Sequence, residues 1–243
     1  MKGLQGVLYG AFIGDAFALS THWEYDTEKL LLEHGNLKDY KDPTRSLFHK
    51  GKRKGDFTHY GDQSLLLLRS ISSTNGFRIQ DFQTHWLSYM KHYDGYIDHA
   101  SAETLRQLDL SSYSGSSSDE LGGFVRSAPL IYYHFDDSRL MDMIAQQTML
   151  THNNHDLLDI SQAMTRAILE LVVSNPFEAT IRQSLSTYPK WATILEGVLK
   201  RLHEDTIETV KDIGQSCSSQ FAFPAALYIA IKYQDDFLKA MQM

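Results

Sequence analysis

The sequence predicts an all-α protein, a multi-helix bundle larger than a simple four-helix one. Apolar residues recur at spacings of three and four wherever the spacing can be judged, whereas alternation over a strand length is scarce. A chain of 243 residues with 42% hydrophobic residues can bury a sizeable core, so we expect one domain over residues 1–243. The helical spacing is clearest at Leu157, Ile160, Met164, Ala167, Ile168 and Leu171.

The first predicted helix covers residues 3–19. It resembles a signal peptide superficially, because an apolar run follows one lysine, but Asp15 interrupts that run. Gly6, Gly10 and Gly14 recur every fourth residue and form one helical stripe, where a neighbouring helix could approach closely. We therefore predict a buried first helix, and no segment reaches transmembrane length.

The remaining predicted helices follow from the same apolar spacing and are separated by polar or glycine-containing turns. The longest predicted loops cover residues 35–62 and 109–123, and the second is rich in serine and glycine. Such composition suits a lid over a site, but it is also typical of a plain linker. The helices are predicted at residues 26–34, 63–73, 79–92, 100–108, 139–149, 156–174, 177–185, 190–202, 205–214 and 222–241.

Charge and cysteine content restrict the partners and the compartment. The net charge is −7 and the isoelectric point is near 5.8, so the chain has no basic stripe for a nucleic acid. A membrane partner is not expected either. The single cysteine, Cys217, cannot form an intramolecular disulfide, which predicts a reducing, cytoplasmic location.

Two aspartates stand directly before predicted helices, and each has two interpretations. Asp62, in the stretch Gly61-Asp62-Gln63-Ser64, can cap the following helix, a contact worth about 1 kcal/mol, or can hold a metal ion. Asp98 can likewise cap a helix, or can act as a carboxylate that activates water. The spacing alone favours the cap in both cases.

Two further stretches could bind a ligand. Gly122 and Gly123 can expose N–H groups to an anion, with Arg126 one turn later adding charge, but a tight turn and a surface arginine explain the stretch equally well. His152 and His155 are three residues apart, as in some metal pairs, yet the surrounding residues look like a loop that caps the next helix. No further histidine or cysteine stands at a recognised zinc spacing, so zinc is not expected.

Familiar catalytic signatures are missing from the sequence. It contains no G-x-S-x-G stretch, no P-loop and no G-x-G-x-x-G, and Cys217 lies outside any known nucleophile signature. Serine hydrolase and phosphoryl-transfer chemistry are therefore not expected.

The order of the polar stretches resembles the ADP-ribosylglycohydrolase family, the all-helical magnesium-dependent hydrolases that remove ADP-ribose from proteins and small molecules. The resemblance implies a compact orthogonal multi-helix bundle. The stretches that carry it are G-A-F-I-G-D-A-F-A at 10–18, H-Y-G-D-Q-S-L at 59–65, Y-I-D-H-A-S-A-E-T-L at 96–105, L-G-G-F-V-R-S-A-P-L at 121–130, T-H-N-N-H-D at 151–156 and S-C-S-S-Q-F-A-F-P-A-A-L-Y at 216–228.

The resemblance implies a magnesium site that is altered in this chain. Typical members have Thr-Asp-Asp-Thr where this sequence has residues 61–64, and the first three side chains bind two Mg²⁺ ions. Here Gly61 has no ligand oxygen, Asp62 is retained, Gln63 replaces a carboxylate with an amide, and Ser64 keeps a hydroxyl. Because Mg²⁺ relies on carboxylates, the resemblance implies one weak ion at Asp62, Gln63 and Ser64 in place of a pair.

The resemblance also assigns roles to residues elsewhere. Asp98 matches an acidic residue near the scissile ribose that orients or deprotonates water, and is the expected catalytic residue. Gly122, Gly123 and Arg126 match the start of a helix that faces the ligand, and His152 matches a nearby loop. Family members usually continue past residues 222–241 into a Gly-Gly-Asp-x-Asp-Thr type segment that completes the metal site, which this sequence lacks.

Three functions follow as alternatives. The first is a hydrolase that cleaves the glycosidic bond at the ribose anomeric carbon of an ADP-ribosylated protein or small molecule. The second is a catalytically inactive protein that binds ADP-ribose. The third is a structural, crystallin-like protein or a truncated gene product, in which exposed apolar residues such as Phe237 and Leu238 lower the stability.

Overall fold

A computed structural model describes the whole chain except residues 1, 45–47, 108–114 and 174. The described residues are all-α, with two isolated β-bridges, Ser116 to His152 and Glu120 to Ser218, and no strand among them. The helices are α1 (Lys2–Ala18), α2 (Thr27–His34), α3 (His59–Thr74), α4 (Ile79–Met90), α5 (His99–Gln107), α6 (Gly122–Val125), α7 (Ala128–His134), α8 (Leu140–Met149), α9 (His155–Val172), α10 (Phe177–Leu185), α11 (Pro189–Lys200), α12 (Thr206–Ile213), α13 (Ser219–Lys232) and α14 (Phe237–Gln242).

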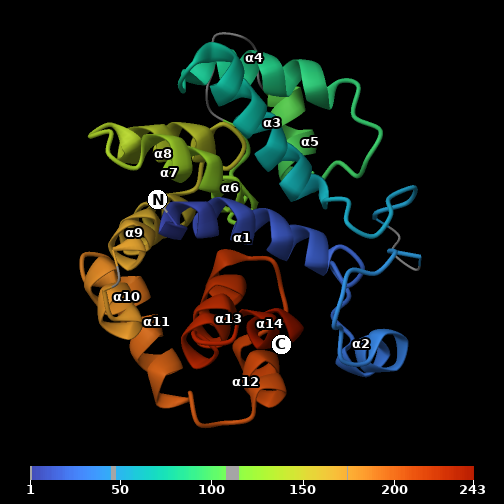
Figure 1. The fold of residues 1–243 in the computed structure, drawn as a ribbon, viewed down its shortest axis with the longest axis vertical. Helices are drawn as coiled ribbons and strands as arrows, with labels where there is room; N and C mark the ends of the chain where they lie inside the picture. Colours follow the sequence, from blue (N-terminus) through green and yellow to red (C-terminus); the bar gives the residue numbers. More distant parts are fainter. Residues whose placement is uncertain (1, 45–47, 108–114, 174) are drawn as a thin grey trace.

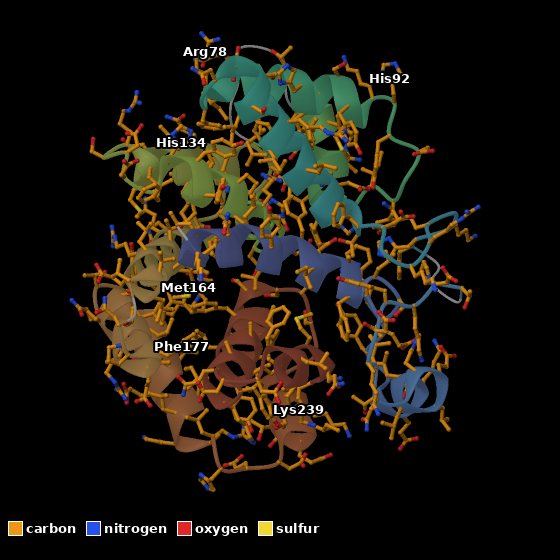
Figure 2. All side chains as sticks on the ribbon, viewed as in Figure 1. Arg78, His92, His134, Met164, Phe177 and Lys239 are labelled. Atoms are coloured by element: carbon orange, nitrogen blue, oxygen red, sulfur yellow. The ribbon has the colours of Figure 1, made fainter. Side chains whose placement is uncertain are left out.

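Helix α1 crosses the middle of the molecule, with α3 to α8 on one side and α9 to α14 on the other (Figure 1). Each side has its own apolar cluster. The first cluster is centred on α3, α4, α7 and α8 and includes the buried Trp86. The second is centred on α9, α11 and α13 and includes the buried Trp191; Met164 and Phe177, labelled in Figure 2, lie on its α9 and α10 side.

Helix α9 connects the two clusters. Its Ile160 is fully buried in the second cluster, whereas Ile168, two turns later, packs against the first. The two residues point to different packing faces, because residues eight apart on a helix differ in direction by about 80°. Helix α9 thus buries apolar side chains in both clusters, and this burial stabilises the packing of the two sides.

Most predicted helices are confirmed, with two differences. Helices α6 and α7 were not predicted, since both are too short to show an apolar period. The predicted helix at 222–241 is two helices, because the chain turns between Tyr233 and Asp236. The interpretation of residues 109–123 as a lid depends on residues 109–114, which lie outside the described residues, and it stays a prediction.

The expectation of a buried first helix is wrong in part. Leu8 and Phe17 are buried, but the side chain of Tyr9 is 60% exposed. A methyl group added at Gly6 or at Gly10 would meet nothing within 4 Å, so no neighbouring helix packs closely against the glycine stripe there. The apolar residues of α1 surround the helix, and periodicity alone could not tell which of them face solvent.

Exposed apolar residues also occur near the C-terminus, as the sequence predicts. The side chains of Phe237 and Leu238 in α14 are 55% and 46% exposed. No helix among the described residues combines the length and apolar character that a membrane crossing requires.

Candidate functional site

The start of helix α3 is held by a carboxylate from α1. Asp15 accepts hydrogen bonds from the Thr58 backbone N–H at 2.8 Å, from Thr58 Oγ1 at 2.6 Å and from the Gly61 N–H at 3.1 Å. Burial raises the pKa of the Asp15 carboxyl, and the hydrogen bonds from Thr58 oppose this shift. Thr58 is the N-cap of α3, and Asp62 lies inside its first turn. The expectation that Asp62 caps the helix is therefore wrong.

Gly61 is required by the position of Asp15. A Cβ atom at residue 61 would lie 2.2 Å from Asp15 Oδ2 and 2.7 Å from Phe57 Cβ. Neither neighbour can move easily, since Asp15 is fixed by three hydrogen bonds. The place that a threonine side chain would fill is thus occupied by the carboxylate of Asp15.

Asp62 is paired with groups from two other parts of the chain. Its Oδ2 lies 2.6 Å from Lys52 Nζ and accepts a hydrogen bond from the Tyr93 hydroxyl at 2.5 Å. Burial and the hydrogen bond to Asp62 raise the pKa of Tyr93, so its hydroxyl is protonated at neutral pH and donates this hydrogen bond. The side chains of Lys52 and Asp62 are only 16% and 17% exposed, which protects this ion pair from solvent.

Gln63 and Ser64 are also bonded to protein groups. The Gln63 side-chain oxygen accepts hydrogen bonds from Trp86 Nε1 at 2.8 Å and from Arg126 Nη1 at 3.2 Å. Ser64 Oγ donates to the Tyr60 carbonyl oxygen at 2.9 Å. The oxygen of Gln63 has therefore filled both of its acceptor positions.

This arrangement does not fit a pair of magnesium ions. A carboxylate is the strongest Mg²⁺ ligand available here, and the one at Asp62 already faces an ammonium group. An ion would have to displace Lys52 and break the hydrogen bonds to Gln63. The single weak Mg²⁺ site at Asp62, Gln63 and Ser64 stays a prediction.

Asp98 caps helix α5 and lies beside a histidine. Its Oδ1 accepts a hydrogen bond from the Ser101 N–H at 2.7 Å, and its Oδ2 accepts one from Ser101 Oγ at 2.9 Å. The capping interpretation of Asp98 is thus confirmed. Its Oδ2 also lies 3.3 Å from His59 Nε2, and both side chains are almost completely buried.

A cavity of about 250 Å³ opens beside Asp98. The rings of Trp23, Phe48 and Tyr96 pack edge to face on its wall, with centroids 4.8 to 5.1 Å apart. A larger hollow of about 440 Å³ lies against α10 and contains none of the predicted site residues. The smaller cavity is lined by Trp23, Tyr25, Phe48, Tyr96, Asp98, His99, Glu120 and Cys217.

Glu120 brings a second carboxyl group to the cavity. Its Oε1 accepts a hydrogen bond from Cys217 Sγ at 3.3 Å, and its buried Oε2 has no hydrogen-bond partner among the described residues. Burial raises the pKa of the Glu120 carboxyl, and the nearby charge of Asp98 acts in the same direction. Burial also raises the pKa of the Cys217 thiol to about 11, so Cys217 is a thiol at neutral pH.

Trp23 has a backbone conformation that non-glycine residues rarely adopt, with φ of 65°. Such strain costs on the order of 1 to 3 kcal/mol and is often found at functional sites. It positions the indole at the cavity wall, against the rings of Phe48 and Tyr96. The sequence offered no signal for this, because a tryptophan with positive φ cannot be recognised from its neighbours.

Gly122 and Gly123 allow close packing. A Cβ at Gly122 would lie 2.5 Å from Tyr60 Cε1, and one at Gly123 would lie 3.0 Å from His152 Cβ. His152 is buried, and its Nδ1 lies 2.8 Å from Thr151 Oγ1; burial lowers its pKa to about 3. The roles of these three residues in ligand binding stay predictions.

Arg126 is the charged centre of a buried network. Its side chain is 2% exposed, so the alternative of a surface arginine is wrong. Its guanidinium donates to Gln147 Oε1 at 2.8 Å, to the Gln147 carbonyl at 2.7 Å and to Thr151 Oγ1. With Gln63 as a further acceptor, the donors of Arg126 point at protein groups. Its predicted contact with a ligand is not tested by this geometry.

His155 does not join His152. The side chain of His155 is 89% exposed and lies 3.4 Å from Asp159 Oδ2, while His152 is buried. Asn154 caps α9 by accepting a hydrogen bond from the Leu157 N–H at 3.3 Å, as the loop composition predicted.

Three other histidines form a cluster beside the cavity. One ring nitrogen from each of His22, His49 and His59 lies within 4.8 Å of the others, a spacing that could hold a metal ion. The rings of His22 and His59 also pack against Trp23 of the cavity wall. The sequence gives no signal for this cluster, because the three residues come from separate segments and follow no known ligand spacing.

Comparisons with known proteins agree with the resemblance seen in the motifs. A profile of the ADP-ribosylglycohydrolase family matches residues 3–243. A solved structure from an ADP-ribosylglycohydrolase-related protein complex superposes with a TM-score of 0.66 and 17% sequence identity, over 100% of this chain and 81% of that one. At this identity the match shows the fold. No curated protein matches the sequence significantly.

Proposed function

Because the chain belongs to the ADP-ribosylglycohydrolase family, we propose that it hydrolyses the glycosidic bond at the ribose anomeric carbon of an ADP-ribosylated protein or small molecule. The observation that carries this proposal is the cavity into which Asp98 and Glu120 both open. Hydrolysis of a glycosidic bond typically uses two carboxyl groups, one as base or nucleophile and one as acid.

The environments of the two carboxyl groups support different roles. Glu120 has a raised pKa, which favours its protonated form and suits an acid. Asp98 accepts two hydrogen bonds from Ser101, which fix the direction of its carboxylate and suit a base.

In the proposed reaction, Asp98 takes a proton from water while the water oxygen forms a bond to the anomeric carbon. The bond from that carbon to the leaving atom breaks, and its electron pair stays on the leaving group. The leaving group receives the proton of Glu120. ADP-ribose with a free anomeric hydroxyl is released, and a proton passes from Asp98 to Glu120 through solvent to restore the site.

The size of the cavity limits the part of the substrate that enters. At about 250 Å³ it is smaller than the cavities of about 300 to 1,000 Å³ that enclose drug-sized ligands. We propose that the ribose and the scissile bond enter, and that the aromatic rings of Trp23, Phe48 and Tyr96 pack against the sugar. The adenosine end would then lie outside this cavity.

Magnesium has no step in this proposal. When bound in such a site, magnesium supplies positive charge that orients the ribose hydroxyls and the attacking water. In this chain Lys52 brings a positive charge to Asp62, the same carboxylate that the predicted ion would use. We propose that the Lys52–Asp62 pair replaces part of that charge.

One observation favours a second function. The ion pair of Lys52 and Asp62 can stabilise the fold without supplying charge to the reaction. In that case the chain binds ADP-ribose without hydrolysing it. Ligand binding without turnover would identify this protein as the inactive ADP-ribose binder.

The proposed roles predict different losses for two variants. Asp98→Asn should lower kcat/KM about a hundredfold or more for every substrate, because the base acts whichever group leaves. Glu120→Gln should lower kcat/KM to the same extent only for substrates with an alcohol or amine leaving group. It should change kcat/KM little for a nitrophenol leaving group, which needs no proton to depart. Release of ADP-ribose, followed by chromatography, measures both rates.

Asp235→Asn is the matched control for these variants. Asp235 is exposed in the turn between α13 and α14 and does not line the cavity, so it should not affect the rate. Equal losses on both kinds of substrate for Glu120→Gln would rule out its role as an acid. An unchanged rate for a folded Asp98→Asn would overturn the proposal.

A further inference from the structure

We propose that His22, His49 and His59 bind one divalent transition metal ion, of which zinc is the representative, at the back of the aromatic cavity wall. This site differs in ligand type from the magnesium position at residues 62–64. It stands on its own geometry and does not depend on the proposed hydrolase activity.

The three rings already lie close together. His22 Nδ1 is 2.8 Å from His49 Nε2, and these two rings stack with centroids 5.0 Å apart. His59 lies 5.5 Å from His22 and 6.0 Å from His49, again measured between ring centroids. Each residue can offer a nitrogen within 4.8 Å of the other two.

The distances require a small rearrangement when the ion binds. Zinc–nitrogen bonds are about 2.0 to 2.1 Å long, so two nitrogens on a tetrahedral ion are about 3.3 Å apart. The nitrogens of His22 and His49 would separate by about half an ångström and give up the hydrogen bond between them. The proton of that hydrogen bond would move to the other nitrogen of its own ring, so that each imidazole stays neutral. The third nitrogen would approach them, which side-chain rotation can supply.

The chemical state of the rings suits a metal. Burial lowers the pKa of His22 and of His59 to about 3, and that of His49 to about 4. All three imidazoles are therefore neutral at physiological pH, which is the form that binds metal ions.

His59 supplies an independent observation. It is completely buried, and neither ring nitrogen makes a hydrogen bond among the described residues. Leaving such a polar group unsatisfied costs about 1 to 3 kcal/mol, and coordination would remove this cost.

The carboxylate of Asp98 completes the surroundings of the cluster. Its Oδ2 lies 3.3 Å from His59 Nε2. The second ring nitrogen of a histidine ligand commonly donates a hydrogen bond to a carboxylate, which fixes the ring and strengthens it as a ligand. The ammonium of Lys52 opposes a cation at His49, and the carboxylate of Asp62 acts in the opposite direction.

The donor set determines the class of ion. Imidazole suits zinc, copper, nickel and cobalt, whereas magnesium and calcium require oxygen ligands. Three protein ligands are the number found in catalytic zinc sites, which leave one position for water or substrate. The half-buried His22 gives the ion a route from solvent.

The test is uptake of zinc by the purified protein. After treatment with chelator and dialysis against zinc, we expect one zinc per chain by elemental analysis. Cobalt(II) in place of zinc should give the intense visible absorption of a tetrahedral site. His22→Gln and His59→Gln should each weaken binding at least about a hundredfold.

His155→Gln is the matched control, since His155 is an exposed histidine outside the cluster and should leave zinc uptake unchanged. His22→Gln is the decisive variant, because His22 is only partly buried and its replacement is expected to leave the helices intact by circular dichroism. Full zinc uptake by the folded His22→Gln protein, or no stoichiometric uptake by the wild type, would overturn the proposal. Hydrolase activity plays no part in either readout.

Discussion

Replacing Gly61 with alanine is expected to destabilise the protein by about 3 kcal/mol, since overpacking typically costs 1 to 3 kcal/mol and hydrogen bonds to Asp15 are lost as well. The added methyl group would lie 2.2 Å from Asp15 Oδ2 and 2.7 Å from Phe57 Cβ. Asp15 would have to move, and its movement would release the hydrogen bonds from Thr58 that start α3. Denaturant unfolding followed by circular dichroism measures the loss.

Gly10→Ala is the control for this substitution. Gly10 also lies in a helix, but a methyl group added there meets nothing within 4 Å. That variant should be more stable than the wild type by about 0.5 to 1 kcal/mol, because glycine is unfavourable inside a helix. If both alanine variants were equally stable, Asp15 would not be a fixed part of the site.

Arg126→Met should lower the free energy of unfolding by about 3 kcal/mol or more, because several buried acceptors lose their donor and each costs about 1 to 3 kcal/mol when unsatisfied. Burial lowers the pKa of Arg126 to about 10, so its guanidinium remains charged at neutral pH. Its removal leaves acceptor atoms of Gln63, Gln147 and Thr151 without their donor. Chemical denaturation again gives the value.

Arg139→Met is the corresponding control. The Arg139 side chain is 72% exposed and its ion pair with Asp137 lies in solvent, so its loss should change stability far less. A similar small effect for Arg126→Met would mean that the buried network contributes little to the fold.

The sequence predicted the helical architecture because apolar residues recur every three or four positions along long amphipathic helices. Helix α9 was found within a residue or two at each end, since its apolar residues and its Asn154 cap are both local signals. Short helices such as α6 and α7 give no such signal, and α6 is placed by its contacts with Tyr60 and Gln147.

The site was predictable only where its residues lie in one stretch. The cap at Asp98 was predicted because an aspartate before a helix is a local pattern. Its catalytic role came from the family resemblance and stays a proposal. Lys52, Glu120 and the histidine cluster were missed, since tertiary contacts bring them together from separate segments.

The carboxylate from α1 is the clearest example of this limit. Gly61 looked like a lost metal ligand in the sequence, because its replacement of threonine removes an oxygen. In the folded chain Asp15, 46 residues earlier, occupies that space and accepts the N–H of Gly61. The change at residue 61 is therefore part of a rearranged site with its own internal partners.

We propose that this rearranged site binds the ribosyl group without magnesium, since the ammonium of Lys52 already faces Asp62. Calorimetric titration of ADP-ribose into the purified protein, with Mg²⁺ and again in Mg²⁺-free buffer, tests it most directly. We expect binding with the same Kd in both buffers. Binding that occurs only with Mg²⁺, or no binding in either buffer, would contradict it.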